Sequence, residues 1–347
     1  MHMADALISP AVGATMWAAT AGAAAYSIKK VQSKLDDKKI PLMGVMGAFI
    51  FAAQMINFSI PGTGSSGHLG GGLILAILLG PYAGFLAMAS ILIIQALFFA
   101  DGGLLALGCN IFNLGFFTCF VAYPLVYKNM IGKEFFAKRI IIASMVTAII
   151  GLQLGAFGVV LETLFSGKTE LPFSSFVLLM QPIHLAIGIV EGLVTAAAVS
   201  FVWKARPEIM EKAALNQALG ALPIKKVMIG LAAIAVFTGA VLSWFASSHP
   251  DGLEWSMFKT SGKEELEASG NIHQKLAAIQ GETAFLPDYG FKAAGKIEPT
   301  EEQTEKWPAV NGGTSLSGLV GGMMTLLLAA FMGFIINVKN KVKKRSE

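Results

Sequence analysis

The feature that most constrains the fold of this sequence is a series of nine apolar stretches, each ended by charged residues or by glycine and proline. A helix needs about 20 mostly apolar residues to cross the hydrocarbon core of a bilayer. Only 14% of the residues are charged, whereas soluble domains carry about 25%. We therefore predict an all-α polytopic membrane protein with about nine transmembrane helices. The stretches are 5–27, 41–58, 69–81, 82–100, 104–127, 140–162, 177–203, 227–246 and 315–338.

The distribution of Lys and Arg predicts the orientation of these helices. With the N-terminus outside and the C-terminus inside, 19 of the 26 basic residues fall in inside segments, as the positive-inside rule requires. Those segments are 28–40, 128–139, 204–226 and 339–347. The third stretch is short, and only Gly80 and Pro81 separate it from the fourth. If these two stretches formed a single helix, the predicted orientation of every later helix would be inverted.

Polar segments divide the chain into two predicted units. Residues 1–205 form a membrane domain of about seven helices, and 206–226 form a cytoplasmic linker. Residues 227–347 form an accessory domain whose two helices flank an outside loop, 247–314. That loop holds 11 acidic residues against 6 Lys, so we expect it to be solvated.

Motifs for metal-dependent or serine hydrolysis and for ATP binding are absent from the sequence. There is no HExxH and no GxSxG, and Gly167-Lys168-Thr169 lacks the first glycine of a phosphate-binding loop, since Glu162 stands at that position. We therefore expect a transporter subunit that is not an enzyme, and any ATP hydrolysis would be supplied by other subunits. A membrane enzyme is disfavoured by the missing motifs. A self-sufficient secondary transporter would be expected to show inverted repeats and a midplane site on broken helices, and neither is evident in the sequence.

The first two residues offer a metal chelate. The amine of Met1, the deprotonated amide nitrogen of His2 and the His2 imidazole would form two fused rings lying nearly in one plane. Planar nitrogen donors favour Ni(II) or Cu(II). His68 lies in a glycine-rich loop on the same predicted outer side and would fill the open position. The alternative is that His2 belongs to a frayed terminus and that His68 is an ordinary loop histidine.

Several polar residues near the outer boundary would orient these ligands from behind, as outer-shell groups do in metal sites. They are Asn57, Ser66, Gln95 and Asp101, with Asn110 and Asn113 nearby. His184 and Glu191 are seven residues apart and share one face of a predicted helix. Because ionisable residues within a bilayer usually face the bundle interior or a partner, we expect structural pairing or hydrogen bonding inside the bundle, with a direct role in metal passage as the alternative. His249 and His273 are expected to be solvated.

Small residues recur at a spacing of four in the first two predicted helices. Gly44, Ala48 and Ala52 form one such stripe, and Ala14, Ala18 and Gly22 form another. Small residues at this spacing let membrane helices approach closely. The stripe at 44–52 is therefore either internal packing or a docking face for another membrane subunit. Asp5 is expected to cap the first helix.

Several strings in the first 205 residues closely resemble one family. They are Met1-His2-Met3, Gln54-Met-Ile-Asn57-Phe, Gly67-His68-Leu-Gly-Gly-Gly, Leu79-Gly-Pro81, Gln95-Ala-Leu and Asp101-Gly-Gly-Leu-Leu-Ala-Leu-Gly-Cys-Asn-Ile-Phe-Asn113. In this order they resemble the CbiM/NikM substrate-binding (S) component of cobalt/nickel energy-coupling-factor (ECF) transporters. Further along, Pro250-Asp-Gly-Leu-Glu254 resembles the signature of the PDGLE domain of NikN-type accessory subunits, and Leu286-Pro-Asp-Tyr-Gly290 is similar to it. The whole chain thus resembles a NikMN fusion.

The resemblance implies a metal site at Met1, His2 and His68, the same donors that the chelate argument gives. It also implies a multi-pass protein of the cell membrane, working with a transmembrane coupling subunit (T component) and cytoplasmic ATPase subunits. We expect the substrate-capture subunit of an ECF-type ABC importer for Ni(2+), with no bound cofactor and no nucleic-acid partner. The alternatives are Co(2+) uptake by the same mechanism and an ATP-independent secondary metal transporter.

Overall fold

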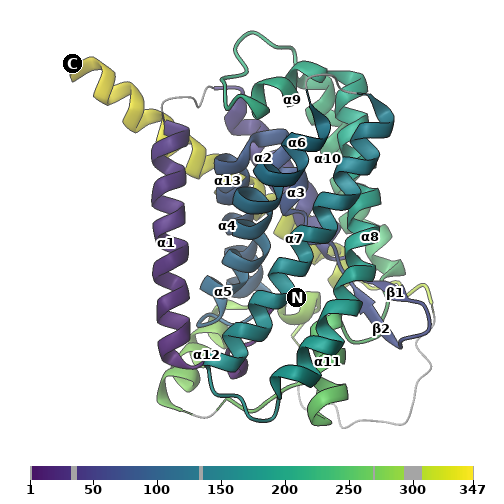
Figure 1. Cartoon of the computed structure of the whole chain (residues 1–347). Coiled ribbons are helices and arrows are strands. Elements are labelled where there is room, and N and C mark those ends of the chain that lie inside the picture. Colours follow the sequence, from purple (N-terminus) through teal and green to yellow (C-terminus); the bar gives the residue numbers. More distant parts are fainter. Residues whose placement is uncertain (1, 33–36, 133–135, 269, 293–306, 347) are drawn as a thin grey trace.

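The computed structural model describes residues 2–32, 37–132, 136–268, 270–292 and 307–346, with side chains as far as Val338. It is a bundle of helices with one short antiparallel hairpin, β1 (Phe58–Ile60) and β2 (Ser65–Gly67) (Figure 1). The helices of the first part are η1 (Asp5–Leu7), α1 (Pro10–Gln32), α2 (Lys39–Gln54), α3 (Gly72–Leu79), α4 (Pro81–Phe98), α5 (Leu107–Ile111), η2 (Phe112–Tyr127), α6 (Lys128–Ile131), α7 (Ala137–Phe165), α8 (Phe173–Ala205) and α9 (Pro207–Ala214). Those of the second part are α10 (Lys225–Ala240), η3 (Leu242–Phe245), α11 (Gly252–Ser261), α12 (Asn271–Thr283), η4 (Pro287–Tyr289) and α13 (Gly312–Ser346).

All nine predicted stretches fall on helices, but only five helices in the described part of the chain are long and apolar enough to cross a membrane by themselves. They are Pro81–Phe98, Leu107–Ile131, Ala137–Phe165, Phe173–Ala205 and Gly312–Val338, and Lys39–Gln54 is a shorter apolar helix. The structure thus has helices at all nine places, and nine full-length crossings stay a prediction.

The short third stretch shows why the count differs. Helix α3 has 8 residues, all buried, and a helix of that length extends only about 12 Å. That is far less than the ~30 Å of a hydrocarbon core. The buried irregular residues 68–71 precede it, and its last turn leads to Gly80, beside Ala213 of α9. Irregular backbone of this kind is tolerated at membrane depth only where protein surrounds it.

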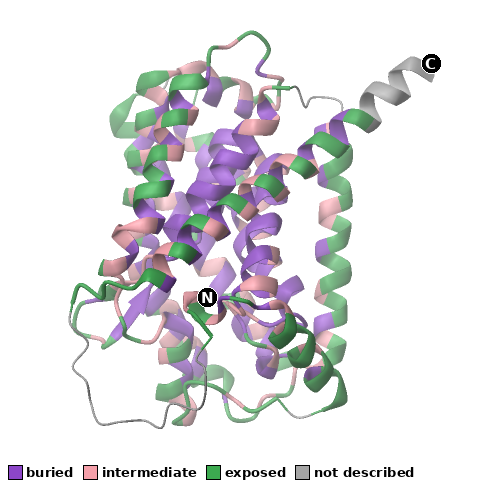
Figure 2. Cartoon of the chain, turned by 180° about the vertical axis from the view of Figure 1, so that it is seen from behind, coloured by how far each residue is buried: buried purple, intermediate pink, exposed green. Residues whose placement is uncertain are grey.

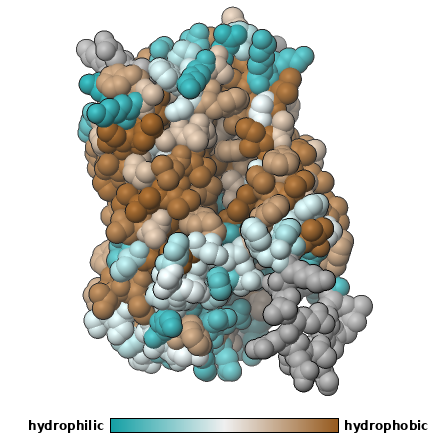
Figure 3. All heavy atoms as spheres, turned by 90° about the vertical axis from the view of Figure 1, so that its right-hand side faces the viewer, coloured by the Kyte–Doolittle hydropathy of each residue, from teal (hydrophilic) through white to brown (hydrophobic). Residues whose placement is uncertain are grey.

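The surface of the bundle carries an apolar belt. Figure 3 shows this belt between two polar ends. Large apolar side chains are exposed on α7, α8, α10 and α13, among them Ile141, Leu178, Val236 and Phe331. The buried residues gather in the middle, where α3 and α4 lie (Figure 2). The chain is a multi-pass membrane protein.

The two helices of the accessory part are packed into the bundle. Helix α2 contacts both α10 and α13. A Cβ added at Gly44 would lie 2.8 Å from the carbonyl oxygen of Leu326, and Ala48 and Ala52 are also buried. The stripe Gly44, Ala48 and Ala52 is therefore covered by α13 of the same chain. A docking face for another subunit does not fit this position, whereas internal packing does.

The expected loop between the last two helices is folded in its described part. Helices α11 and α12 lie at the same end of the bundle as the hairpin and the N-terminal segment (lower end of Figure 1). The expected linker likewise contains α9, which lies at the opposite end and buries Ile209, Met210 and Ala213. The acidic loop thus covers the end of the molecule at which the predicted metal ligands lie.

Candidate metal centre

The N-terminal segment is held in place by its main chain. The Met3 amide donates to Asn110 Oδ1 over 2.8 Å, and the Met3 carbonyl accepts from Asn110 Nδ2 at 3.2 Å and from the Gly103 amide at 2.9 Å. Met3 itself is fully buried. The alternative that His2 belongs to a frayed terminus is therefore wrong, because the chain is held in place from His2 onward. Met1 lies outside the described residues.

Asp5 does not cap the first helix. Its Oδ1 accepts from the amides of Leu105 (2.8 Å) and Ala106 (3.0 Å), just before α5. A Cβ at Gly103 would lie 1.9 Å from that same oxygen, so only glycine fits there. The carboxylate therefore joins the N-terminal segment to the loop that follows α4.

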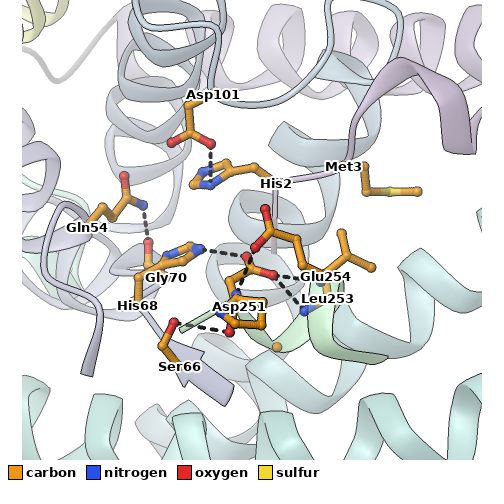
Figure 4. A network of polar contacts seen from close by, with 12 residues as sticks. His2, Met3, Gln54, Ser66, His68, Gly70, Asp101, Asp251, Leu253 and Glu254 are labelled. Atoms are coloured by element: carbon orange, nitrogen blue, oxygen red, sulfur yellow. Dashed lines mark hydrogen bonds and ion pairs between the residues drawn. The ribbon is translucent and has the colours of Figure 1, made fainter. Parts of the chain in front are cut away.

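His2 and His68 lie together, as the sequence predicted. Their rings are stacked, with centroids 4.8 Å apart and planes 6° apart (Figure 4). The side chains are 7% and 8% exposed, so both imidazoles lie largely out of bulk water.

Asp101 lies behind His2, where a supporting group was expected. Its Oδ1 is 3.1 Å from His2 Nδ1, and its Oδ2 accepts a hydrogen bond from the Tyr289 hydroxyl. Burial alone would raise the pKa of Asp101, but the neighbouring His2 charge and the hydrogen bonds from His2 and Tyr289 hold it below its usual range. His2 Nε2 is buried and has no hydrogen-bond partner among the described residues.

His68 presents one ring nitrogen to the site. Its Nδ1 is 3.1 Å from the carbonyl oxygen of Leu69, which can only accept, so Nδ1 carries the proton. Its Nε2 lies 3.7 Å from Asp251 Oδ2. Burial lowers the pKa of His68, which favours the neutral imidazole that a metal requires.

The glycine-rich loop after His68 is fixed from two sides. Gln54 Nε2 donates to the Gly70 carbonyl over 2.8 Å, and Gln95 Nε2 donates to Gln54 Oε1 over 2.8 Å. On the other side, the Glu191 carboxylate accepts from the amides of Gly70 (2.7 Å) and Gly71 (3.1 Å). Gln95 thus supports the loop through Gln54, and Glu191 has a structural role.

His184 and Glu191 are both buried and hydrogen-bonded inside the bundle, as expected, but not to each other. The Nδ1 of His184 donates to the Met180 carbonyl over 2.8 Å, and its buried Nε2 has no hydrogen-bond partner in the described part of the chain. His184 also lines a small cavity together with His68 and Asp251. His184 thus lies close to His68, but no hydrogen bond joins it to either ligand histidine within the described residues.

Two of the expected supporting residues contact the accessory domain instead of the histidines. The Asn57 carbonyl accepts from the Ser247 amide over 2.7 Å, and Ser66 Oγ donates to the His249 carbonyl over 2.8 Å. His273, expected to be solvated, is 6% exposed, and its Nε2 is 2.9 Å from the Ile8 carbonyl oxygen. That expectation was wrong because α12 packs onto the N-terminal segment.

A cavity of about 460 Å³ opens over the two histidines. Its described lining contains no Lys or Arg and seven carboxylates, namely Asp5, Asp101, Asp251, Glu254, Glu264, Glu265 and Asp288. A cleft lined by one sign of charge concentrates counter-ions, here cations. Within the described residues, no group of three or more His, Cys, Asp or Glu side chains is arranged to hold a metal ion.

Two residues of the accessory domain, Asp251 and Tyr289, join the site without having been predicted there. Both occur in strings that resemble the PDGLE signature, Pro250–Glu254 and Leu286–Gly290, and the structure brings both to the histidines. The two similar strings were the only signal for this in the sequence.

Comparison with known proteins matches two parts of the chain to two families. Residues 2–209 match the CbiM family, described as a cobalt uptake substrate-specific transmembrane region, and residues 225–338 match the PDGLE domain. A relative from Archaeoglobus fulgidus, provisionally named fused nickel transport protein NikMN, is 35% identical over 244 residues, covering 70% of this chain and 79% of the relative. The fused nickel transport protein NikMN of Rhodobacter capsulatus is 33% identical over 224 residues, covering 60% of this chain and 64% of the relative.

A solved structure described as a transition metal transporter is also similar. It is 31% identical, superposes with a TM-score of 0.53, and the match covers 62% of this chain and 99% of that chain. Together with the apolar belt and the long helices, these matches show that the chain belongs to the CbiM family of substrate-specific transmembrane proteins, joined here to a PDGLE domain.

Proposed function

We propose that this chain is the substrate-capture subunit of an ECF-type nickel importer. The carrying observation is the stacked pair His2 and His68 at the base of an acidic cavity. The proposed donors are the Met1 amine, the His2 amide nitrogen, the His2 imidazole and His68 Nε2. Four nitrogen donors in one plane suit Ni(II). The family is one of metal transport, which favours a transporter over an enzyme.

In this proposal the surrounding residues prepare the donors. A ligating histidine usually donates its other ring N–H to a carbonyl or carboxylate, and the contact of His68 Nδ1 with the Leu69 carbonyl leaves Nε2 for the metal. The fused chelate uses His2 Nδ1, the atom that faces Asp101. Loading therefore requires Nδ1 to exchange Asp101 for the metal, and release is the reverse exchange.

Energy for release would come from partner subunits. We infer a transmembrane coupling subunit and cytoplasmic ATPases, because the sequence carries no ATP-binding motif. Nickel uptake by cells that lack every candidate ATPase subunit would overturn this part in favour of a secondary transporter.

The nickel assignment is tested by competition. The purified full chain is equilibrated with equal Ni(II), Co(II), Cu(II) and Zn(II), and the metal retained after gel filtration is measured by mass spectrometry. We expect one metal per chain, with Ni(II) preferred over Co(II). Cobalt is the alternative substrate, because the matching family is described as one of cobalt uptake. Retention of Co(II) over Ni(II) would assign the chain to cobalt uptake.

A further inference from the structure

The accessory domain holds the loop that carries His68. The Ser66 amide donates to the Pro250 carbonyl over 2.8 Å, and Trp255 Nε1 donates to the Thr63 carbonyl over 2.9 Å. These bonds join β2 and its turn to the segment that begins α11. His68 follows β2 directly, so its position depends on the accessory domain.

Asp251 is fixed within this segment. Its Oδ1 accepts from the amides of Leu253 (2.8 Å) and Glu254 (2.9 Å), and its own amide donates to Glu254 Oε2 over 2.9 Å. This reciprocal arrangement is a capping box at the start of α11. With Oδ1 held by the helix, Oδ2 is the oxygen that faces His68 Nε2, at 3.7 Å (Figure 4).

We propose that Asp251 is part of the metal site, so that the PDGLE segment supplies an anionic group to the bound dication. The inference rests on the proposed function, because it takes His68 Nε2 as a metal donor. A metal on that nitrogen lies beside a carboxylate that is already positioned. Asp251 thereby stands ready to neutralise the charge of a metal that binds His68 Nε2.

Charge balance supports this role. A dication bound with one deprotonated amide keeps a net positive charge, and a buried charge is unfavourable unless a counter-charge or hydrogen bonds compensate it. The site provides one carboxylate beside each histidine, Asp101 at His2 and Asp251 at His68. The accessory domain contributes to both, since Tyr289 donates to Asp101. A helix cap alone does not account for the contact of Asp251 with His68.

The test compares two variants of the full chain that each lose one negative charge from the same segment. In Asp251→Asn, the amide oxygen still accepts at the N-cap, where Asn is as favourable as Asp. In Glu254→Gln, the capping box is also kept, because Gln serves at that position. Glu254 lines the same cavity as Asp251. Comparing the two variants therefore distinguishes an effect of Asp251 beside His68 from the effect of removing any one negative charge from the cavity.

Nickel affinity is measured by titration with NiCl2, and Cu(II) serves as a spectroscopic probe by electron paramagnetic resonance. We expect Asp251→Asn to weaken Ni(II) binding by about 10- to 100-fold and to shift the Cu(II) spectrum. Glu254→Gln removes a carboxylate from the cavity without facing His68, so it should weaken Ni(II) binding less than Asp251→Asn does and leave the Cu(II) spectrum unchanged. Thermal unfolding checks that both variants fold.

Equal affinities in Asp251→Asn and the wild type, or equal losses in the two variants, would overturn the role of Asp251 and leave the proposed function standing. An unchanged Cu(II) spectrum in Asp251→Asn would count against proximity to the metal. A wild-type chain that binds no nickel overturns the proposed function, and this inference with it.

Discussion

The imidazoles of His2 and His68 lie face to face, with centroids 4.8 Å apart and planes 6° apart. Because a ring nitrogen bonds a metal in the plane of its ring, two stacked rings direct their lone pairs along parallel planes. One ring must turn before both can bind the same ion. His68 is held by the Leu69 carbonyl and faces Asp251, whereas His2 has one buried nitrogen without a partner among the described residues. We therefore expect His2 to move during loading.

Adding one Ala before Met1 is expected to abolish tight nickel binding. The insertion turns the first proposed donor into an amide and moves the amine out of the chelate ring. Metal stoichiometry of the purified chain measures the effect, with gel filtration as the check on folding. Unchanged stoichiometry in the extended protein would remove the Met1 amine from the site.

His68→Ala is expected to lose tightly bound nickel, whereas His184→Ala is expected to retain it. The first variant leaves a three-nitrogen chelate, and the second removes a side chain that is hydrogen-bonded to Met180. Both histidines are buried and line the same small cavity, so each variant controls for the packing loss in the other. Equal loss of nickel in the two variants would show that the fourth ligand is not His68 alone, and that His184 belongs to the site or replaces His68 in it.

Tyr289→Phe is expected to weaken nickel binding by about tenfold, the lower end of outer-shell effects. The Phe ring would still stack on Phe99, where the centroids are 5.1 Å apart, so only the hydrogen bond to Asp101 is lost. Titration with NiCl2 measures the change. Tyr26→Phe is the control, because Tyr26 is 51% exposed on α1. Equal affinity in wild type and Tyr289→Phe would show that Asp101 works without that hydrogen bond.

Glu191→Gln is expected to lower the free energy of unfolding by about 1–3 kcal/mol, because one of two buried amides loses its acceptor. A carboxylate can accept from both Gly70 and Gly71, but an amide side chain offers only one oxygen. Denaturant titration in detergent measures the difference. Glu170→Gln makes the same change at an exposed residue and should leave stability unchanged. Matching stability in the two variants would argue that the loop is fixed by Gln54 alone.

The sequence predicted the helices well because hydropathy directly reflects burial in an apolar medium. It could not tell a full-length crossing from a short helix enclosed by protein, because the same apolar composition suits the eight-residue α3. His68 was found because a histidine among glycines is unusual. The partners of His68 were not, since Asp251 lies far away in sequence and reaches the site only by tertiary packing.

Polar residues inside the bundle were placed correctly, but their partners could not be identified from the sequence. His184 and Glu191 share a helix face, yet each takes a main-chain partner, Met180 in one case and Gly70 with Gly71 in the other. Main-chain groups leave no signal in a pattern of side chains. His273 appeared solvated because its segment is polar, and only the docking of α12 buries it.

The last prediction separates the two interpretations of the small-residue stripe. Gly44→Ala is expected to lower the free energy of unfolding by about 1–3 kcal/mol, because the new Cβ would lie 2.8 Å from the Leu326 carbonyl oxygen and force α2 and α13 apart. Gly22→Ala is the matched control on α1. Its Cβ would meet nothing within 4 Å, so the better helix propensity of Ala should keep or raise stability. Denaturant titration in detergent compares the variants, and co-purification tests for the coupling subunit. A Gly44→Ala chain with wild-type stability that no longer retains the coupling subunit would restore the docking interpretation.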